Sequence, residues 1–326
     1  MNARKLSSKA VIDTQGGFMH NRILVPLDGS EVAECVLPHI EALAAVNKAV
    51  DITFLHVVQP ISMLLADQIY KAQMKSDAIT EAKNYIRGII SGLKNKGKTH
   101  AEVITGKAAD SILDYAEHNH IKLIVMSSHG QSGISRSSHG SVADKVLNES
   151  RIPVLRIRAD SPRIPFYIAG QKMKVIVPLD GSELAERVLN NVKGLVDYFG
   201  TGAIDIVLLR VCELFIQPNA YPPAMSLSWE EYVKFETRVC KGICMSYLND
   251  VKKHFKKELI YIRSVVPVGN PADEVIKYVN KEKADLMVMS THGRSGISRW
   301  AFGSISNKIL QGTSTPVIIL RSNQKS

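Results

Sequence analysis

Apolar residues along this chain alternate between short uninterrupted runs and longer stretches in which they recur every three or four positions. The short runs predict buried β-strands, and the longer stretches predict amphipathic helices. Strands are predicted at 22–27, 51–58, 101–105, 123–126 and 154–157, and again at 174–179, 204–211, 260–266, 285–289 and 316–321. Helices are predicted at 31–44, 76–94 and 108–119, and at 183–197, 230–254 and 272–281. Such alternation favours right-handed βαβ units, so we expect two Rossmann-like α/β domains, each a mostly parallel five-stranded sheet with helices on both faces.

Two signatures occur twice in the chain, which indicates a tandem duplication. Residues 23–30 return as 175–182, which is 152 positions later, and residues 126–141 return as 289–304, which is 163 positions later. The second copy therefore has 11 additional residues between its signatures, where a loop tolerates an insertion. We expect a tail at 1–20, one domain at 21–159, a linker at 160–172 and a second domain at 173–322.

The longer signature joins a predicted strand to a predicted helix through a glycine-rich loop. In the second copy the strand ends at Met289, and Gly303 and Ser304 precede the next helical pattern. Backbone N–H groups at a helix N-terminus attract anions, so this loop is suited to hold phosphate. Asp28 and Asp180 follow the first strand of each copy, where a carboxylate accepts hydrogen bonds from a ribose or a base amino group. These features predict a nucleotide site in each half.

The two signatures resemble those of the universal stress protein family. The residues that carry the resemblance are Pro-Leu-Asp-Gly-Ser after the first strand, His56-Val57 at the end of the second, and Gly-x9-Gly-Ser after the fourth. The resemblance covers both halves and implies an adenine nucleotide α hydrolase-like fold that binds ATP, with or without Mg²⁺, in a stress-response regulator. Ser127 and Ser290 stand where the family signature begins with glycine, and Arg210 replaces the histidine in the second copy.

The resemblance also assigns nucleotide-binding residues position by position. In the first half they are Pro26, Leu27, Asp28, Val57, Met126, Ser127, Gly130, Gly133, Gly140, Ser141 and Val142. In the second half they are Pro178, Leu179, Asp180, Val211, Met289, Ser290, Gly293, Gly296, Gly303, Ser304 and Ile305. No catalytic residue and no metal ligand is expected, and His129 and His292 are interpreted as loop-ordering residues because no nucleophile or paired carboxylate accompanies them.

Three functions are compatible with the sequence. Nucleotide binding in a regulator is the leading hypothesis, a pair of halves that binds proteins without nucleotide is the second, and slow ATP hydrolysis is the third. The sequence lacks signatures of phosphate-transferring enzymes such as Gly-x4-Gly-Lys-(Ser/Thr), so at most weak hydrolysis is expected. The family associates through its last strand, so the apolar strands 154–157 and 317–320 are expected to join the halves as an internal pair. A homodimer and an unidentified signalling protein are further partners that the resemblance allows.

Composition bears on the location of the protein and on the classes of partner that it is expected to bind. Hydrophobic residues make up 45% of the chain, and no apolar run reaches the ~18 residues of a membrane helix. The N-terminus has no secretory signal pattern, so we expect a cytoplasmic protein without membrane association. The net charge is +10, but the Lys and Arg residues are mixed with Asp and Glu along the chain. Nucleic-acid binding is therefore not expected. Cys35, Cys212, Cys240 and Cys244 are expected to be buried, reduced thiols, with metal binding as the minor alternative.

Overall fold

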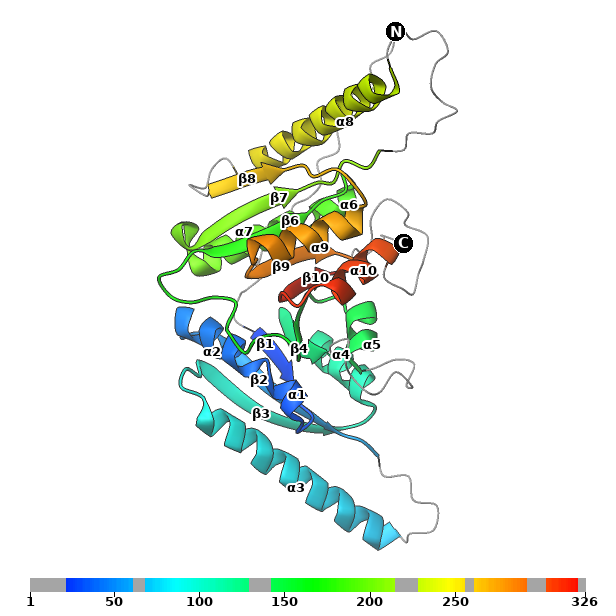
Figure 1. Cartoon of the computed structure of the whole chain (residues 1–326). Coiled ribbons are helices and arrows are strands. Elements are labelled where there is room, and N and C mark those ends of the chain that lie inside the picture. The colour runs from blue at the N-terminus through cyan, green and yellow to red at the C-terminus, as the bar shows by residue number, and fades with distance from the viewer. Residues whose placement is uncertain are drawn as a thin grey trace, which may run out of the picture.

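The chain forms one sheet in which the two halves are joined edge to edge (Figure 1). This computed structural model describes residues 22–60, 68–128, 142–214, 228–255, 261–291 and 303–321. The strands of the first half are β1 (Arg22–Pro26), β2 (Asp51–Val58), β3 (Lys98–Thr105), β4 (Leu123–Ser128) and β5 (Val154–Arg158). Those of the second half are β6 (Met173–Pro178), β7 (Ile204–Leu209), β8 (Tyr261–Val265), β9 (Leu286–Ser290) and β10 (Val317–Leu320). Their order across the sheet is β3-β2-β1-β4-β5-β10-β9-β6-β7-β8.

Strand pairing is parallel within each half and antiparallel where the halves meet. β1 pairs in parallel with β2 and with β4, and β6 pairs in the same way with β7 and with β9. Between the halves, β5 and β10 pair antiparallel, with Leu155 opposite Ile318 and both side chains buried. The predicted fold class is confirmed, and the two apolar last strands cover each other's edges as expected. We call this β5–β10 contact the seam.

Helices cover both faces of the sheet (Figure 1). They are α1 (Glu31–Glu34), α2 (Leu37–Val46), α3 (Gln68–Gly92), α4 (Ala108–His118), α5 (Val142–Glu149), α6 (Glu183–Glu186), α7 (Val188–Phe199), α8 (Trp229–Lys252), α9 (Pro271–Glu282) and α10 (Ser304–Gly312). Alternate strand residues point to opposite faces: Ile23 and Val25 pack with α2 and α3, whereas Leu24 packs with α4 and α5. None of the helices in the described ranges has the length and apolar character needed to cross a membrane.

The linker between the halves is anchored by one aromatic side chain. Phe166 is buried, and its ring stacks on His39 of α2, with ring centroids 5.5 Å apart, and meets Phe199 of α7 edge-on at 6.2 Å. The backbone N–H of Phe166 donates to Nδ1 of His39 over 3.1 Å. The hydroxyl of Tyr198 in α7 donates to the carbonyl of Leu43 in α2 over 2.7 Å. The halves therefore pack together on one face of the sheet as well as at the seam.

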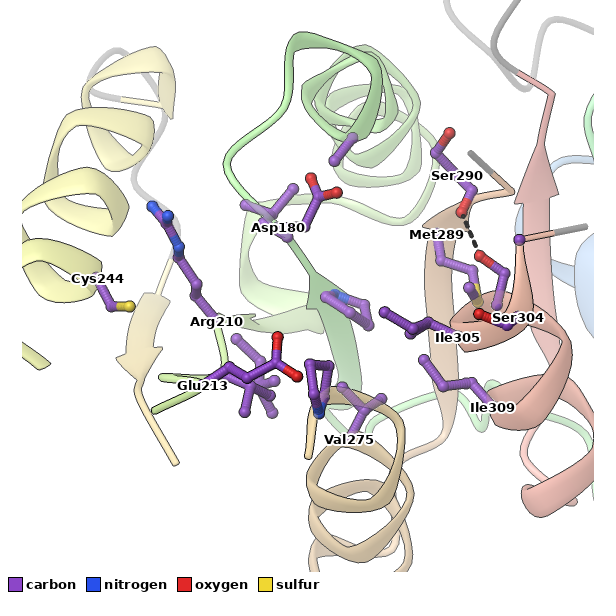
Figure 2. A pocket seen from close by; sticks show the side chains of 18 of the residues that line it. Asp180, Arg210, Glu213, Cys244, Val275, Met289, Ser290, Ser304, Ile305 and Ile309 are labelled. Carbon is purple, nitrogen blue, oxygen red and sulfur yellow. Dashed lines mark hydrogen bonds between the residues drawn. The ribbon is translucent and has the colours of Figure 1, made fainter. Parts of the chain in front are cut away.

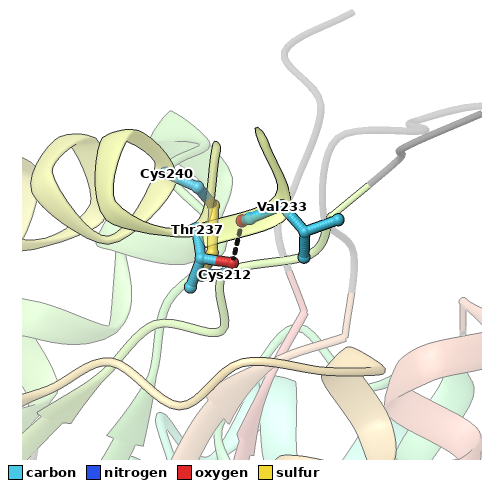
Figure 3. Close-up of a disulfide and its surroundings, with 4 residues drawn as sticks. All are labelled: Cys212, Val233, Thr237 and Cys240. Carbon is cyan, nitrogen blue, oxygen red and sulfur yellow. Dashed lines mark hydrogen bonds between the residues drawn. A yellow bond between two sulfur atoms is a disulfide. The ribbon is translucent and has the colours of Figure 1, made fainter. Parts of the chain in front are cut away.

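A disulfide joins the end of β7 to α8 in the second half (Figure 3). Cys212, shortly after β7, is bonded to Cys240 of α8, with their Cα atoms 5.9 Å apart. The expectation of four reduced thiols is therefore wrong for this pair, because α8 returns over the strand end and brings together cysteines 28 positions apart. Cys35 and Cys244 are free and buried, as expected. Within the described residues, no cluster of His, Cys, Asp or Glu is arranged to hold a metal ion.

Candidate functional site

Each half has a cavity where its first and fourth strands end. From β1 the chain continues through β2 and β3 on one side, and it returns through β4 and β5 on the other. Connections that lead away in opposite directions leave a crevice at the carboxyl ends of the strands, which is where open α/β sheets bind ligands. The cavity of the first half, beside β1 and β4, has a volume of about 220 Å³. The cavity of the second half, beside β6 and β9, has a volume of about 500 Å³.

The structure brings together all the predicted site residues that it describes. Those that line the first cavity are Pro26, Leu27, Asp28, Val57, Met126, Ser127 and Val142. Those that line the second cavity are Pro178, Leu179, Asp180, Val211, Met289, Ser290, Gly303, Ser304 and Ile305 (Figure 2). The other predicted residues, Gly130, Gly133, Gly140, Ser141, Gly293 and Gly296, lie outside the described residues. Convergence on a cavity is a matter of geometry, and the binding role of these residues stays a prediction.

An aspartate is held at the same place in each cavity by the turn that follows it. Ser30 donates to Oδ1 of Asp28 from its backbone N–H over 3.0 Å and from its hydroxyl over 2.6 Å. Ser182 makes the same two bonds to Asp180, at 2.9 Å and 2.6 Å. Gly181 between them has a φ of +88°, a conformation that side chains disfavour. The Asp-Gly-Ser sequence therefore presents a carboxylate in a fixed orientation at the cavity.

Helix α10 begins at the second cavity with a glycine, Gly303, for which the described part of the chain shows no conformational or packing requirement. Gly303 has a φ of −57°, and a Cβ added there would lie 3.6 Å from the carbonyl oxygen of Thr291, which is an ordinary contact. Neither backbone conformation nor packing within the described residues explains the glycine. The first N–H groups of a helix have no intrahelical acceptor, so the start of α10 presents backbone donors at the edge of the cavity. The hydroxyl-bearing side chains of Ser290 and Ser304 stand beside this helix end (Figure 2).

An exposed apolar side chain stands at the equivalent position of both cavities. Ile305, in the first turn of α10, is 48% exposed, and Val142, at the start of α5, is 39% exposed. Both side chains line their cavities. Apolar surface gains free energy when it is covered, so a ligand with an apolar face, such as a nucleoside, suits these positions.

Behind the aspartate of the first half lies a tyrosine from the long helix. The hydroxyl of Tyr85 in α3 donates to Oε1 of Glu34 over 2.9 Å, and its ring meets His56 with ring centroids 6.2 Å apart. Burial raises the pKa of Tyr85, and the hydrogen bond to Glu34 adds to the effect. Burial also lowers the pKa of His56, against the negative charge of Asp28. The histidine is therefore neutral near pH 7 and adds no positive charge at the end of β2.

The second half differs at this position because it has a permanent cation. The guanidinium of Arg210 lies over the ring of Tyr247 in α8, 4.4 Å from its centroid, in a cation–π arrangement. It also packs against Gly181, where an added Cβ would be 2.9 Å from the guanidinium carbon. Burial raises the pKa of Tyr247. Figure 2 shows Arg210 between α8 and Asp180, so its charge lies at the edge of the second cavity.

Several lining residues were not among those predicted. Gln59 of the first cavity and Glu213 of the second follow β2 and β7, and Cys240, Ile243 and Cys244 come from α8. The spacing of the two cysteines places them on one helix face, and this signal indicates that they share surroundings. Glu213 belongs to neither repeated signature, so the sequence offers no signal for it.

The fold and the two cavities define a tandem Rossmann-like α/β protein with one candidate ligand site in each half. The sequence profile described as "Universal stress protein family" matches residues 19–158 and 173–321. These two ranges cover most of the chain. The chain therefore belongs to the universal stress protein family and carries the family's domain twice in tandem.

Individual relatives match either the whole chain or one half. A universal stress protein of Mycolicibacterium smegmatis is 22% identical over 311 residues, which cover 92% of this chain and 96% of that protein. A universal stress protein of Methanocaldococcus jannaschii is 30% identical over 156 residues, which cover 43% of this chain and 96% of that protein. The crystal structure of a universal stress protein from Archaeoglobus fulgidus has a TM-score of 0.64 at 20% identity, covering 92% of this chain and 98% of that one. This last likeness concerns the fold.

Proposed function

We propose that this protein is a stress-response regulator that binds an adenine nucleotide, ATP in the first instance, in one or both of its cavities. The nucleotide-binding units are residues 21–159 and 173–322. In the second half, the nucleoside would lie beside Asp180 and Ile305, and the phosphates would lie at the N-terminus of α10, with or without Mg²⁺. We place this regulator in the cytoplasm.

The observation that carries this function is the glycine at the start of α10. Gly303 is required by neither the backbone nor the packing of the described residues, and it lines the cavity, which favours a role on the cavity side. A group that approaches the helix end closely would meet any larger side chain, and phosphate is the group that helix N-termini bind. The cavity volume of about 500 Å³ is within the ordinary range of small-molecule pockets.

The chemistry of the second cavity favours binding over catalysis. Neither histidine nor lysine is among the described residues that line it. A kinase or ATPase of the usual kind positions the transferred phosphate with a lysine and with metal-binding side chains. A regulator needs only to hold the nucleotide, for which an aspartate, a helix N-terminus and apolar contacts suffice.

Calorimetric titration of the full chain with ATP, with and without Mg²⁺, tests the function. Wild type is expected to bind with a Kd between micromolar and millimolar, because backbone donors hold the phosphates without a lysine. Gly303→Val is expected to abolish binding in the second half, since its side chain would occupy the place of a phosphate. Unchanged stoichiometry and affinity in this variant would show that the assignment is wrong.

The matched control is a glycine of the same half with room for a side chain. An added Cβ at Gly202 would have no heavy atom within 4 Å, so Gly202→Val is expected to bind ATP like wild type. Release of ADP in the same samples measures slow hydrolysis. Nucleotide that stays with the protein through purification would also argue against a role without nucleotide.

A second candidate function is the binding of a protein partner, and it is favoured by exposed apolar side chains along one face of α8. Phe235, Val239 and Ile243 are 47%, 41% and 60% exposed, and their spacing of four positions places them along one side of the helix. Exposed apolar patches on proteins of this kind often mark interaction sites. Phe235→Lys and Val239→Lys are expected to remove a signalling partner without changing ATP affinity, and retained partner binding in both variants would exclude this face.

A further inference from the structure

The C-terminal end of α10 is held by arginines from the other half of the chain. Arg156 of β5 donates from Nη1 to the carbonyl of Leu310 over 2.9 Å. Arg158 of β5 donates from Nη1 to the carbonyls of Gln311 and Thr313, over 3.0 Å and 3.2 Å. The last carbonyls of a helix have no intrahelical donor. The first half therefore supplies partners for the end of a helix that belongs to the second half.

The contact is reciprocal across the seam. Arg321 donates from Nη1 to the carbonyl of Glu149, the last residue of α5, over 3.3 Å. Arg158 and Arg321 are 163 positions apart, which is the offset of the repeated loop signature. Each half thus contributes an arginine to the C-terminus of a helix in the other half. These two helices, α5 and α10, follow the glycine-rich loops, and we call them the loop helices. The exchange is unequal, because Ile319 stands where the first half has Arg156.

These arginines are built into the seam. Arg156 and Arg158 are only 6% and 8% exposed, and a buried cation is costly unless it is hydrogen-bonded. Arg156 also donates from Nε to the hydroxyl of Ser128 over 2.7 Å, and Arg158 donates from Nε to Asp160 over 2.8 Å. Burial lowers the pKa of Arg156 to about 10, so it stays charged at neutral pH. A cation at a helix C-terminus stabilises the helix through its dipole.

The helices that the arginines hold are those that begin at the two cavities. α10 starts at Ser304, and with 9 residues it is roughly 13 Å long. A short helix behaves as a rigid rod, so fixing its last turn also fixes where its first turn points. Ser306 anchors the other end by donating from its hydroxyl to the carbonyl of Thr291 over 3.1 Å. The position of the backbone donors at the cavity therefore depends on both ends of the helix.

We propose that Arg156 and Arg158 are positioning residues for the nucleotide site of the second half, and that Arg321 is a positioning residue for the site of the first. This inference rests on the proposed nucleotide-binding function. Each half then has a complete site only when the other half closes its loop helix at the seam. The second site, which is held by two arginines, depends more strongly on its partner than the first.

Single-site backgrounds of the full chain test this crossed dependence. Asp28→Ala leaves the second site to be measured, and Asp180→Ala leaves the first, by calorimetric titration with ATP. Arg158→Gln is expected to weaken ATP binding about tenfold in the second site and to leave the first within about twofold. Arg321→Gln is expected to do the opposite. Arg158→Lys, which keeps a cation and a donor, is expected to recover part of the loss.

Arg151 provides the matched control variant for this test. Arg151 lies near the end of α5 but pairs with Glu117 of its own half at 4.0 Å, so Arg151→Gln is expected to change neither site. Arg321 is only half-buried, so its variant is expected to fold even if Arg158→Gln does not. Equal losses of ATP affinity at both sites, or no loss in either arginine variant, would overturn the inference. In that case ATP binding by wild type would still support the proposed function. Absence of ATP binding by wild type would overturn both.

Discussion

His39 is an uncharged residue at the contact between the halves. It is 1% exposed, and its Nδ1 accepts the backbone N–H of Phe166. Burial lowers its pKa from 6.5 to about 4. A proton added to Nδ1 would break the bond from the linker and would place a charge in an apolar contact. The linker is therefore docked best while this histidine is neutral.

Replacing His39 should remove part of the acid sensitivity of the fold. The folded pKa lies below the unfolded value, so protonation favours the unfolded chain, and stability falls as pH drops from 6.5 toward about 4. Between pH 7 and pH 5 this histidine should cost about 2 kcal/mol. His39→Asn keeps an acceptor for Phe166 and does not titrate. Urea unfolding at both pH values should show a smaller loss in the variant, and equal losses would contradict the assignment.

At the scale of single residues, local chemistry made the candidate site predictable. Asp180 and Gly303 stand in short repeated signatures, and the bonds that orient Asp180 come from Ser182, two positions along the chain, so their placement follows from the sequence. Glu213 could not be placed in the same way, and Arg210 could be placed only at its strand end, without its partner. Their surroundings depend on where α8 packs, as the contact between Arg210 and Tyr247 shows, and that packing involves residues far apart in the chain.

At the scale of elements, α8 is the part of the second half that has no counterpart in the first cavity. Cys240, Ile243 and Cys244 of this helix line the second cavity, whereas α3 contributes no residue to the described lining of the first. The disulfide from Cys240 to Cys212 fixes α8 to the end of β7. The wall of the second cavity is thus tied covalently to the sheet.

Reduction of this disulfide should loosen α8. A crosslink that closes a loop of this length typically stabilises a fold by roughly 2–4 kcal/mol. Thermal or urea unfolding of wild type should therefore show a less stable protein after treatment with dithiothreitol. The double variant Cys212→Ala, Cys240→Ala should be insensitive to the reductant, because the free thiols of Cys35 and Cys244 do not change. Unchanged wild-type stability, with a higher thiol count, would contradict this expectation.

The helix boundaries show what apolar periodicity detects and what it misses. The sequence predicts a helix at 76–94, and the structure has α3 at Gln68–Gly92. The first turns of α3 were missed because they do not pack on the sheet: Ile69 and Tyr70 are 82% and 54% exposed. Periodicity marks only the part of a helix that buries one face. The buried central strands β1, β4, β6 and β9 were located to within one or two residues at each end, whereas the first residues of the partly exposed edge strand β3 (Lys98–Thr105) were missed.

At the scale of the whole molecule, the seam and the docked linker make the halves one body. β5 and β10 would be bare apolar edges in separate halves, and such edges associate readily. A protease site inserted at 169–172, where the linker is exposed, allows the full chain to be cut after folding. The two fragments should sediment together at micromolar concentration, because strand pairing and the contacts of Phe166 survive the cut. Separation of the fragments would show that the covalent link alone holds them.

Joining the halves in one chain frees them from a constraint that binds symmetric dimers. Two identical subunits around a two-fold axis must present identical sites. Here Arg210 and Glu213 of the second half occupy the positions that His56 and Gln59 have in the first half. The two sites have therefore already diverged in charge. The edge at which separate copies would pair is occupied within the chain. The pairing of the two halves is therefore independent of protein concentration, and the lining of one cavity can change while that of the other stays the same.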